Sequence, residues 1–264
     1  MVPKYLYHYT DIDTVKKIIE SKKIRFKRLD LLNDPYEGVH TLDGLAAYGG
    51  EMRKLIYCSC WTNILQETVN LWAIYSNMQG ARIKMKSTMF SNELKLIEQA
   101  SGFMPVGKID AIKDVPWVGD KETVIDKIYG PFKVEYVEQL NDTYNLAVGV
   151  SKCKSGTSDE FLMHDIDLRE LGNRKIKHWE YENEWRYKIC PYVGVHGGTE
   201  AFRVNDFSYI NSPDYIDIPF TTEIEEIMVG PCVSEQEVED LVKFLEEKEN
   251  HICVQRSSIR ICKK

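Results

Sequence analysis

Short apolar and aromatic runs, separated by turn signals, recur along the chain and constrain its fold more than any other feature. Several alternate between apolar and polar residues, as a strand with one buried face does. The run 55–61 is almost continuously apolar, so we expect it in the centre of a sheet. The predicted strands cover 5–9, 24–26, 55–61, 81–85, 132–137, 182–189, 224–229 and 252–255.

Helices are expected between several of these strands. Thr10 with Asp13 resembles a capping box that opens a helix, and Ser234 with Glu237 resembles another. The second box begins a helix between two strands, so residues 222–264 are predicted as a βαβ element. Further helices are predicted over 66–77, 89–100 and 141–150.

The order of these elements favours an α+β protein with a mixed, mainly antiparallel sheet core and flanking helices. The 264 residues show neither an internal repeat nor a clean linker, so we expect a single domain over 1–264. Residues 100–130 contain Pro105, Pro116 and several glycines, which predicts an insert or long loop.

Charge and composition exclude some classes. The net charge of −7 disfavours a duplex-DNA groove binder, which needs many phosphate-neutralising side chains. A local basic cluster near the N-terminus is either a nucleic-acid contact or a solvated helix face. It comprises Lys16, Lys17, Lys22, Lys23, Arg25, Lys27 and Arg28.

Localisation is predicted from what the chain lacks. No apolar stretch approaches the roughly 20 residues of a membrane span, and the first residues lack the apolar run of a signal peptide. The seven cysteines are odd in number and show no C-x-x-C spacing, so we expect neither a disulfide framework nor a metal. Cys58 and Cys60 fall on one strand face as small buried groups. A cytoplasmic protein without a membrane partner is expected.

Three segments are more polar and aromatic than a core requires. His8 ends the first predicted strand, where ligand crevices form, although a histidine packed in the sheet has the same pattern. The second segment contains Trp61, Trp72 and Tyr75. Its spacing predicts either a slot that stacks a planar ring or simply a hydrophobic stripe. Glu182, Glu184 and Arg186 alternate along the strand predicted over 182–189, on either a buried functional face or a solvated edge. Beside Arg186, Glu184 is expected to stay ionised.

Familiar catalytic motifs are absent. The sequence contains no Walker A, G-x-G-x-x-G, H-E-x-x-H or G-x-S-x-G pattern. P-loop NTPases, Rossmann enzymes, zincins and α/β-hydrolases are therefore disfavoured.

A set of motifs in fixed order resembles an uncharacterised bacterial family, domain of unknown function 2971. The resemblance covers most of the chain, matches least over about residues 100 to 130, and implies no activity. Its motifs are Tyr7-His8-Tyr9-Thr10, Asn33-Asp34-Pro35-Tyr36-Glu37, Cys58-Ser59-Cys60-Trp61-Thr62, Leu71-Trp72-Ala73-Ile74-Tyr75-Ser76, Trp179-Glu180-Tyr181-Glu182-Asn183-Glu184-Trp185-Arg186 and Met228-Val229-Gly230-Pro231.

The order of His8, Tyr75 and Glu184 also resembles the H-Y-E arrangement of ADP-ribosyltransferase-like folds. That resemblance implies NAD as the substrate, held by His8 at its ribose and stacked by Tyr75 at its nicotinamide ring. Glu184 would anchor the nicotinamide ribose and stabilise an oxocarbenium-like transition state. Binding would also involve Thr10, Trp61, Trp72 and Arg186. Glu182 is an alternative to Glu184 as the functional carboxylate. Trp61 and Trp72 are alternatives to Tyr75 as the ring that stacks on nicotinamide.

Two other functions stay open. A non-catalytic nucleotide-binding sensor or interaction module, in stress or phage defence, would use the same aromatic pocket. Asn33, Asp34 and Glu37 would then form a turn, and Glu184 would be a structural partner of Arg186. A metal-dependent hydrolase would instead collect Asp34, Glu37, Glu182 and Glu184 around Mg²⁺. The acceptor, which is a protein, a nucleic acid or a small molecule, and the oligomeric state stay open.

Overall fold

A computed structural model describes residues 1–38, 53–90, 128–139, 170–189 and 213–261, with side chains at all of these positions except 55. Six further strands are described by their backbone. They form three antiparallel pairs: β5 (Leu96–Ile97) with β6 (Val106–Gly107), β7 (Thr123–Val124) with β14 (Tyr192–Val193), and β10 (Val148–Lys154) with β11 (Glu160–Ile166).

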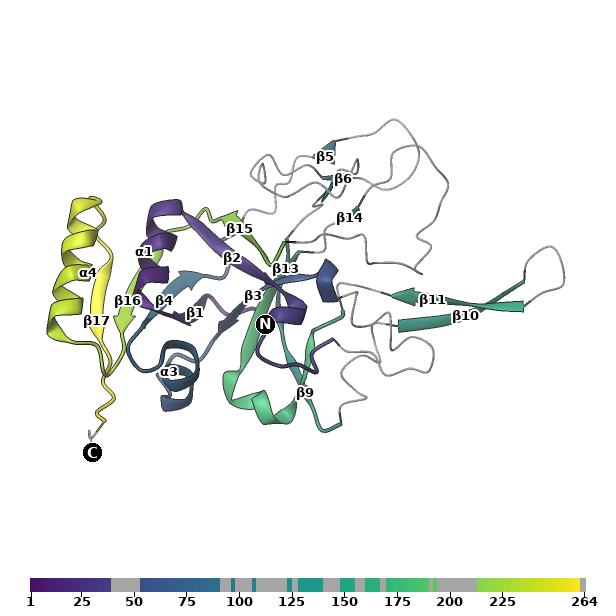
Figure 1. Ribbon diagram of the computed structural model, residues 1–264, viewed down its shortest axis with the longest axis horizontal. Helices are drawn as coiled ribbons and strands as arrows, with labels where there is room; N and C mark the ends of the chain where they lie inside the picture. The colour runs from purple at the N-terminus through teal and green to yellow at the C-terminus, as the bar shows by residue number, and fades with distance from the viewer. Residues whose placement is uncertain are drawn as a thin grey trace.

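A nine-stranded sheet forms the framework of the described chain (Figure 1). Its main path runs β15 (Tyr215–Pro219), β2 (Lys23–Arg28), β3 (Tyr57–Thr62), β1 (Tyr5–Thr10), β4 (Ala81–Lys86), β16 (Ile224–Val229) and β17 (Cys253–Arg256), with β13 (Glu184–Ile189) and β8 (Tyr129–Lys133) branching from β3. Every pair is antiparallel except β16 with β17. The predicted α+β class is confirmed.

The sheet opens at β3, the strand that was predicted to be central. One edge of β3 pairs with β13 along all six residues. A strand has only two edges, so β1 and β2 must share the other. There β2 pairs with Tyr57 and Cys58, whereas β1 pairs with Thr62 alone. The strands β1 and β2 therefore diverge beside the middle of β3.

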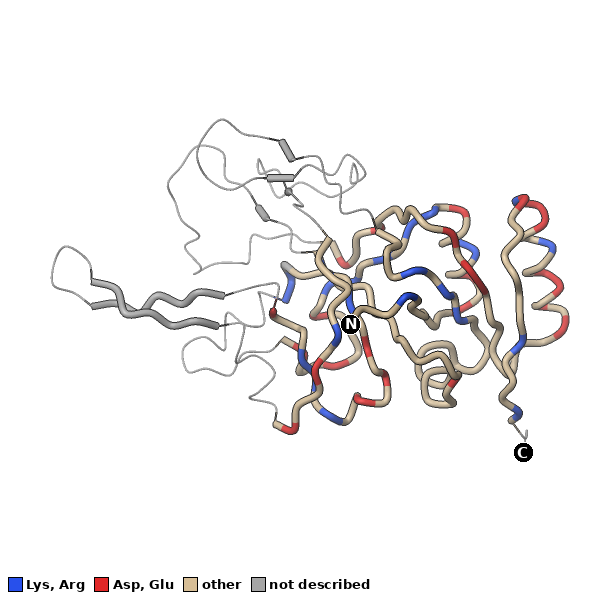
Figure 2. Tube along the Cα trace, turned by 180° about the vertical axis from the view of Figure 1, so that it is seen from behind, with Lys and Arg blue, Asp and Glu red and all other residues tan. Residues whose placement is uncertain are grey.

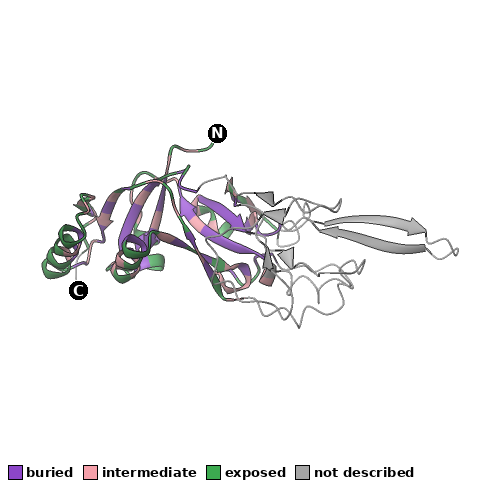
Figure 3. Ribbon diagram, turned by 90° about the horizontal axis from the view of Figure 1, so that it is seen from above, coloured by how far each residue is buried: buried purple, intermediate pink, exposed green. Residues whose placement is uncertain are grey.

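Helices cover the two faces of this sheet. Leu6 and Tyr9 lie three residues apart on β1 and so face opposite sides. Leu6 joins the main core, which also includes residues of α1 (Ile12–Ser21) and α4 (Glu235–Glu247). Tyr9 packs with two residues of α3 (Val69–Ser76) in a second, smaller core. Figure 3 shows the buried strands between these helices, whose outer sides are exposed.

The predicted βαβ element at the C-terminus is confirmed. Strand β16 leads into α4, and β17 returns parallel to β16. Ser234 accepts a hydrogen bond from the Glu237 amide, and the Glu237 carboxylate accepts one from the Ser234 amide. This reciprocal capping box satisfies two amide donors that a helix start leaves free.

Several predicted boundaries were wrong. Asp11, rather than Thr10, caps α1, because its carboxylate reaches the Thr14 amide at 2.6 Å. Helix α3 begins at Val69, after the cap Thr68, three residues later than predicted. The strand predicted over 132–137 is two strands, β8 and β9 (Glu135–Val137).

Two predicted helices differ where the chain is described. Residues 87–90 are not helical and 96–97 form β5, so the helix over 89–100 is wrong there. Residues 148–150 belong to strand β10 rather than to the helix predicted over 141–150. The remaining residues of both predictions, and most of the insert predicted over 100–130, lie outside the described ranges.

Glu182 was predicted in the same strand as Glu184, but it ends the 3₁₀ helix η4 (Lys177–Glu182). Asn183 follows in the left-handed region, at φ 42°. Asparagine tolerates this conformation better than most residues. The chain turns there, and β13 begins at Glu184.

Candidate functional site

A pocket lies where the sheet opens, between β1 and the end of β3. Its empty space, including the open mouth, is about 380 Å³. The walls are mostly aromatic and apolar, with carboxylates of two residues at one side. The lining residues are Tyr7, His8, Tyr9, Cys60, Trp61, Thr62, Leu71, Tyr75, Glu182 and Glu184.

His8 bridges the opening in the sheet. Its Nδ1 lies 2.9 Å from the Cys60 carbonyl oxygen, which can only accept, so Nδ1 carries the proton. Burial lowers the pKa of His8, which favours the neutral ring. The other nitrogen, Nε2, is then a hydrogen-bond acceptor. The ring also packs against Trp61, with centroids 5.2 Å apart.

Tyr75 presents its ring at the mouth of the pocket, where 37% of the residue is exposed. Its hydroxyl accepts a hydrogen bond from Asn33 Nδ2 at 2.9 Å and donates one to Glu182 Oε1. Burial, together with the negative charge of Glu182, raises the pKa of Tyr75 well above its usual value. The phenol therefore stays protonated and fixes the ring between three segments of the chain.

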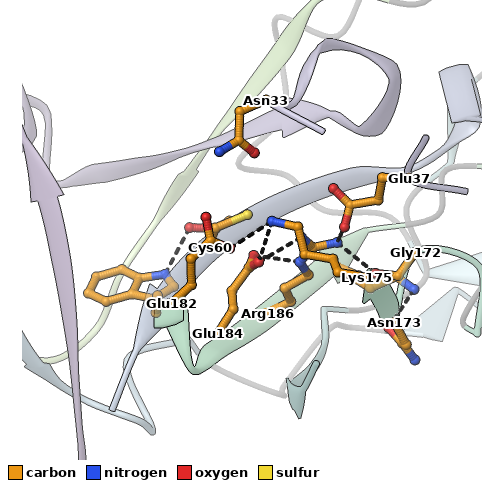
Figure 4. Close-up of polar contacts among 12 residues, drawn as sticks. Asn33, Glu37, Cys60, Gly172, Asn173, Lys175, Glu182, Glu184 and Arg186 are labelled. Carbon is orange, nitrogen blue, oxygen red and sulfur yellow. Dashed lines mark hydrogen bonds and ion pairs between the residues drawn. The ribbon is translucent and has the colours of Figure 1, made fainter. Parts of the chain in front are cut away.

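A buried network of charges lies behind the pocket (Figure 4). Arg186 donates two parallel hydrogen bonds to Glu184, Nε to Oε1 at 2.6 Å and Nη2 to Oε2 at 2.8 Å. The Lys175 ammonium lies 3.0 Å from Glu184 Oε2 and 2.7 Å from Glu182 Oε2. Arg186 also ion-pairs with Glu37. We call these five side chains the charge cluster.

Neighbouring backbone holds the two cations in place. Arg186 Nη1 donates to the Gly172 carbonyl at 2.6 Å, and Gly172 adopts φ 80°, a conformation that suits glycine. Lys175 lies on β12 (Arg174–Ile176), which pairs with β9 and leads directly into η4. The turn at η4 brings Glu182 back to Lys175, only seven residues along the chain.

The register of β13 decides which side chains share a face. Cys60 pairs with Arg186, and Glu184 lies two residues from Arg186, so all three project from one side of the sheet. Trp61 pairs with Trp185, and both belong to the main core on the other side. His8 packs against Trp61, so its ring and Glu184 reach the pocket from different sides.

The two pocket carboxylates differ in ionisation. Burial alone would raise the pKa of Glu184, but Arg186 and Lys175 lower it far below the usual range. Burial raises the pKa of Glu182, because Lys175 offsets it only in part and Glu184 adds repulsion. Burial raises the pKa of Glu37 as well, despite Arg186. Glu184 is thus a fixed anion, whereas Glu182 and Glu37 bind a proton more readily.

The carboxylates also differ in free acceptor capacity. A carboxylate has about four acceptor positions. Glu184 receives two hydrogen bonds from Arg186 and one from Lys175, so three of its positions are filled. Glu182 receives one from Tyr75 and one from Lys175 in the described part of the chain, which leaves room for a ligand donor.

Cys60 is a pocket residue of a different kind. Burial raises the pKa of its thiol, and the neighbouring Glu184 carboxylate raises it further. Because a protonated thiol is a weak nucleophile, Cys60 is not poised for nucleophilic attack. Cys58 is buried on the same strand, as predicted, and its thiol is free, as are those of Cys60, Cys232 and Cys253.

Three of the predicted site residues lie outside the pocket lining. Trp72 is fully buried, packs edge-on against Tyr9 and donates from Nε1 to Glu67, so it offers no face to a ligand. Thr10 is buried at the end of β1. Arg186 is fully buried in the charge cluster. The structure does bring together His8, Trp61, Tyr75 and both glutamates.

Side-chain cations already balance part of the negative charge of the carboxylates that the metal-site hypothesis requires. Glu37, Glu182 and Glu184 do converge, but Lys175 and Arg186 occupy the space between them. Asp34 instead accepts from the Tyr36 amide and forms the predicted turn. Among the described residues, no group of three His, Cys, Asp or Glu side chains is arranged to hold a metal ion.

The N-terminal basic cluster lies on α1 and β2, away from the pocket lining. Arg25 pairs with Asp217, and Arg28 with Asp30 and Asp214. Acidic positions are interspersed with basic ones over this region, and α4 beside it is mainly acidic (Figure 2). The positive charge is therefore offset locally, as on a solvated face.

Lys175 and Tyr136 are the site residues that the sequence patterns missed. Tyr136 Oη accepts from the Glu184 amide at 2.8 Å, and Lys175 joins both glutamates. A lone lysine in a polar segment gives no periodic signal. The signal that could have found it is the pair of glutamates at 182 and 184, which need a counter-charge once they are buried.

Comparisons of the chain with protein-family models, curated proteins and solved structures gave no match. The resemblance to domain of unknown function 2971 therefore stays a prediction from the motifs. Within the described residues, no helix has the length and apolar character needed to cross a membrane.

Proposed function

We propose that the chain is an NAD-using enzyme of the ADP-ribosyltransferase-like type, with the nicotinamide riboside end of NAD in the pocket between β1 and β3. The observation that supports this proposal is a convergence. His8, Tyr75 and Glu184 are far apart in the sequence and come from β1, α3 and β13, yet all three line one pocket.

The pocket supplies the groups that this end of NAD requires. The Tyr75 ring offers a planar surface on which a nicotinamide ring stacks. His8 Nε2 accepts a hydrogen bond from a ribose hydroxyl. The carboxylate of Glu184 is held ionised in a buried position, where charge acts most strongly.

The proposed reaction breaks the bond between the nicotinamide nitrogen and ribose C1′. The bonding electron pair leaves with nicotinamide, which becomes neutral, and the ribose becomes an oxocarbenium-like cation. An acceptor nucleophile or water then attacks C1′ and loses a proton. A preorganised buried anion stabilises the positive charge that develops on the ribose.

A second function, a nucleotide sensor without catalysis, is favoured by one observation. Arg186 and Lys175 already occupy three of the about four acceptor positions of Glu184. Glu184 is then a structural partner of Arg186. Under this hypothesis the pocket binds a nucleotide and leaves it intact.

The test is to incubate the purified protein with NAD and to follow nicotinamide release by chromatography. We expect release by the wild type and a loss of at least about tenfold in Glu184→Gln and Tyr75→Ala. Tyr36→Ala is the matched control, because Tyr36 is exposed and absent from the lining. Circular dichroism shows whether each variant folds.

The outcomes separate the two functions. Calorimetric binding of NAD without any nicotinamide release supports the sensor and contradicts the enzyme. Absence of both binding and release contradicts both functions. Release that is unaffected in Tyr75→Ala would place the reaction elsewhere.

A further inference from the structure

We propose that the pocket selects a planar ring with a positive charge over a neutral ring of the same shape, and that Glu182 is the counter-anion of that ring. This inference rests on the proposed function in taking the pocket as the ligand site. It names the charge of the group that binds and assigns a role to a second glutamate.

The charge cluster holds more carboxyl groups than cations. Glu37, Glu182 and Glu184 face Lys175 and Arg186. The next buried cation on β13, Lys188, donates to the Leu171 carbonyl and to Asn173. Full ionisation leaves the five side chains of the charge cluster with one excess negative charge. Such a charge is costly unless a proton or another cation neutralises it.

Glu182 is the carboxylate through which this excess charge reaches the pocket. Glu184 contacts both cations, so Glu37 shares Arg186 with it and Glu182 shares Lys175. Beyond Lys175, Glu182 contacts only the neutral Tyr75 hydroxyl among the described residues. Of the three carboxylates, only Glu182 and Glu184 line the pocket.

The lining of the pocket is aromatic as well as acidic. Tyr7, Tyr9, Trp61 and Tyr75 line the same pocket as Glu182, and the Arg82 guanidinium already lies over the ring of Tyr7, 4.5 Å from its centroid. Aromatic faces attract cations, and the attraction grows when the cation leaves water. A flat cation in this space would stack on Tyr75 and lie beside the carboxylate to which the Tyr75 hydroxyl is bonded.

The experiment compares two probes of nearly identical shape by calorimetry on the wild-type protein. 1-Methylnicotinamide is a pyridinium cation, and 3-methylbenzamide has a neutral carbon in place of the ring nitrogen. We expect the cation to bind at least about tenfold more tightly. Equal affinities, a preference for the neutral probe, or no binding of either probe would overturn the proposal.

A variant then tests the role of Glu182. In Glu182→Gln we expect the preference for the cation to fall to about threefold or less, with unchanged affinity for the neutral probe. Glu180→Gln is the matched control, because Glu180 lies in the same 3₁₀ helix but is exposed. A full preference retained in folded Glu182→Gln would contradict the assignment. The wild-type comparison remains decisive if that variant does not fold.

This test and the test of the proposed function fail separately. A clear preference for the cation without nicotinamide release from NAD would leave this inference standing and remove the enzyme. Nicotinamide release without any preference between the two probes would do the reverse.

Discussion

The guanidinium of Arg186 and the carboxylate of Glu184 form a pair with two hydrogen bonds inside one fully buried strand, β13. Arg25 and Asp217 form a pair of the same geometry, at 2.9 and 3.0 Å, on the protein surface. The two pairs differ in burial, and Arg186 also binds Glu37 and the Gly172 carbonyl. Comparing them measures how much a buried, networked ion pair contributes relative to an exposed pair within one protein.

Breaking the buried pair should destabilise the protein far more than breaking the exposed one. In Arg186→Met, Glu184 loses its main counter-charge in a buried place, which typically costs about 3–5 kcal/mol. Arg25→Met should cost about 1 kcal/mol or less, because water solvates both partners. Urea unfolding at neutral pH measures both values. Similar losses in the two variants would show that the charge cluster gains no special importance from burial.

The two pocket glutamates should respond to pH in opposite directions. The pKa of folded Glu184 is lowered from the ordinary value of 4.5, so its stabilising contribution is present above that pH and is lost as the pH falls. The pKa of folded Glu182 is raised, so its contribution is complete below 4.5 and is lost as the pH rises through the folded value.

Unfolding free energies measured across pH check this difference. The stability deficit of Glu184→Gln relative to the wild type should shrink as the pH is lowered below about 4.5. The stability of Glu182→Gln relative to the wild type should instead improve as the pH rises above that value. Parallel pH dependence in the two variants would contradict the assignment of different ionisation to the two sites.

The sequence predicted the parts of this molecule that depend on local patterns. The capping box at Ser234 and the aromatic strand that contains His8 involve neighbouring residues, so their spacing is visible in the chain. The position of Glu182 was missed because a turn at Asn183 interrupts an alternation that looks like one continuous strand. Glu184 and Arg186 share a face because they alternate along β13, whereas Glu182 reaches the same cluster from the end of η4.

The site itself depended on contacts that no local pattern encodes. Trp72 and Tyr75 lie one helical turn apart, and spacing alone placed both in one slot. The structure turns Trp72 toward Tyr9 and leaves Tyr75 at the pocket, because α3 is short and apolar on more than one side. Lys175 belongs to the cluster only because β12 pairs with β9, a contact between segments that are distant in the sequence.

His8 should be a neutral ring protonated on Nδ1. Nδ1 must donate to the Cys60 carbonyl, and burial lowers the pKa of the ring. Long-range proton–nitrogen NMR spectra at neutral pH should show Nδ1 as the protonated nitrogen, and the titration midpoint should lie below 6.5. A proton on Nε2, or a midpoint above 6.5, would remove His8 as the acceptor in the pocket.

The Tyr75 hydroxyl should contribute to stability as well as to the shape of the pocket. Tyr75→Phe removes one of the two donors of the buried Glu182 carboxylate, which costs about 1–3 kcal/mol, whereas water can replace the contact of the exposed Asn33. Tyr36→Phe is the control, because Tyr36 is more exposed than Tyr75. Urea unfolding should separate the two variants by more than about 1 kcal/mol. Equal stabilities would mean that water replaces both contacts.

Glu67 should fix the C-terminal segment against α3. One carboxylate oxygen accepts from Trp72 Nε1 at 2.9 Å and from the Ser257 hydroxyl. The other accepts from the Ser258 amide at 2.6 Å and from the Ser258 hydroxyl at 2.7 Å. In Glu67→Ala the buried Trp72 ring loses its acceptor and the segment loses its attachment, so a loss of about 2–3 kcal/mol is expected.

Limited proteolysis should detect this release directly, because cleavage requires a locally opened backbone. We expect faster cleavage after Arg256 or Arg260 by trypsin in Glu67→Ala than in the wild type, with Glu239→Ala, an exposed position on α4, behaving like the wild type. Helix α3 also carries Tyr75. If the bond between Glu67 and Trp72 holds α3 in place, Glu67→Ala should also bind 1-methylnicotinamide more weakly. Unchanged cleavage would show that the strand pairing of β17 with β16 alone retains the C-terminal segment, and Glu67 would then serve only the indole of Trp72.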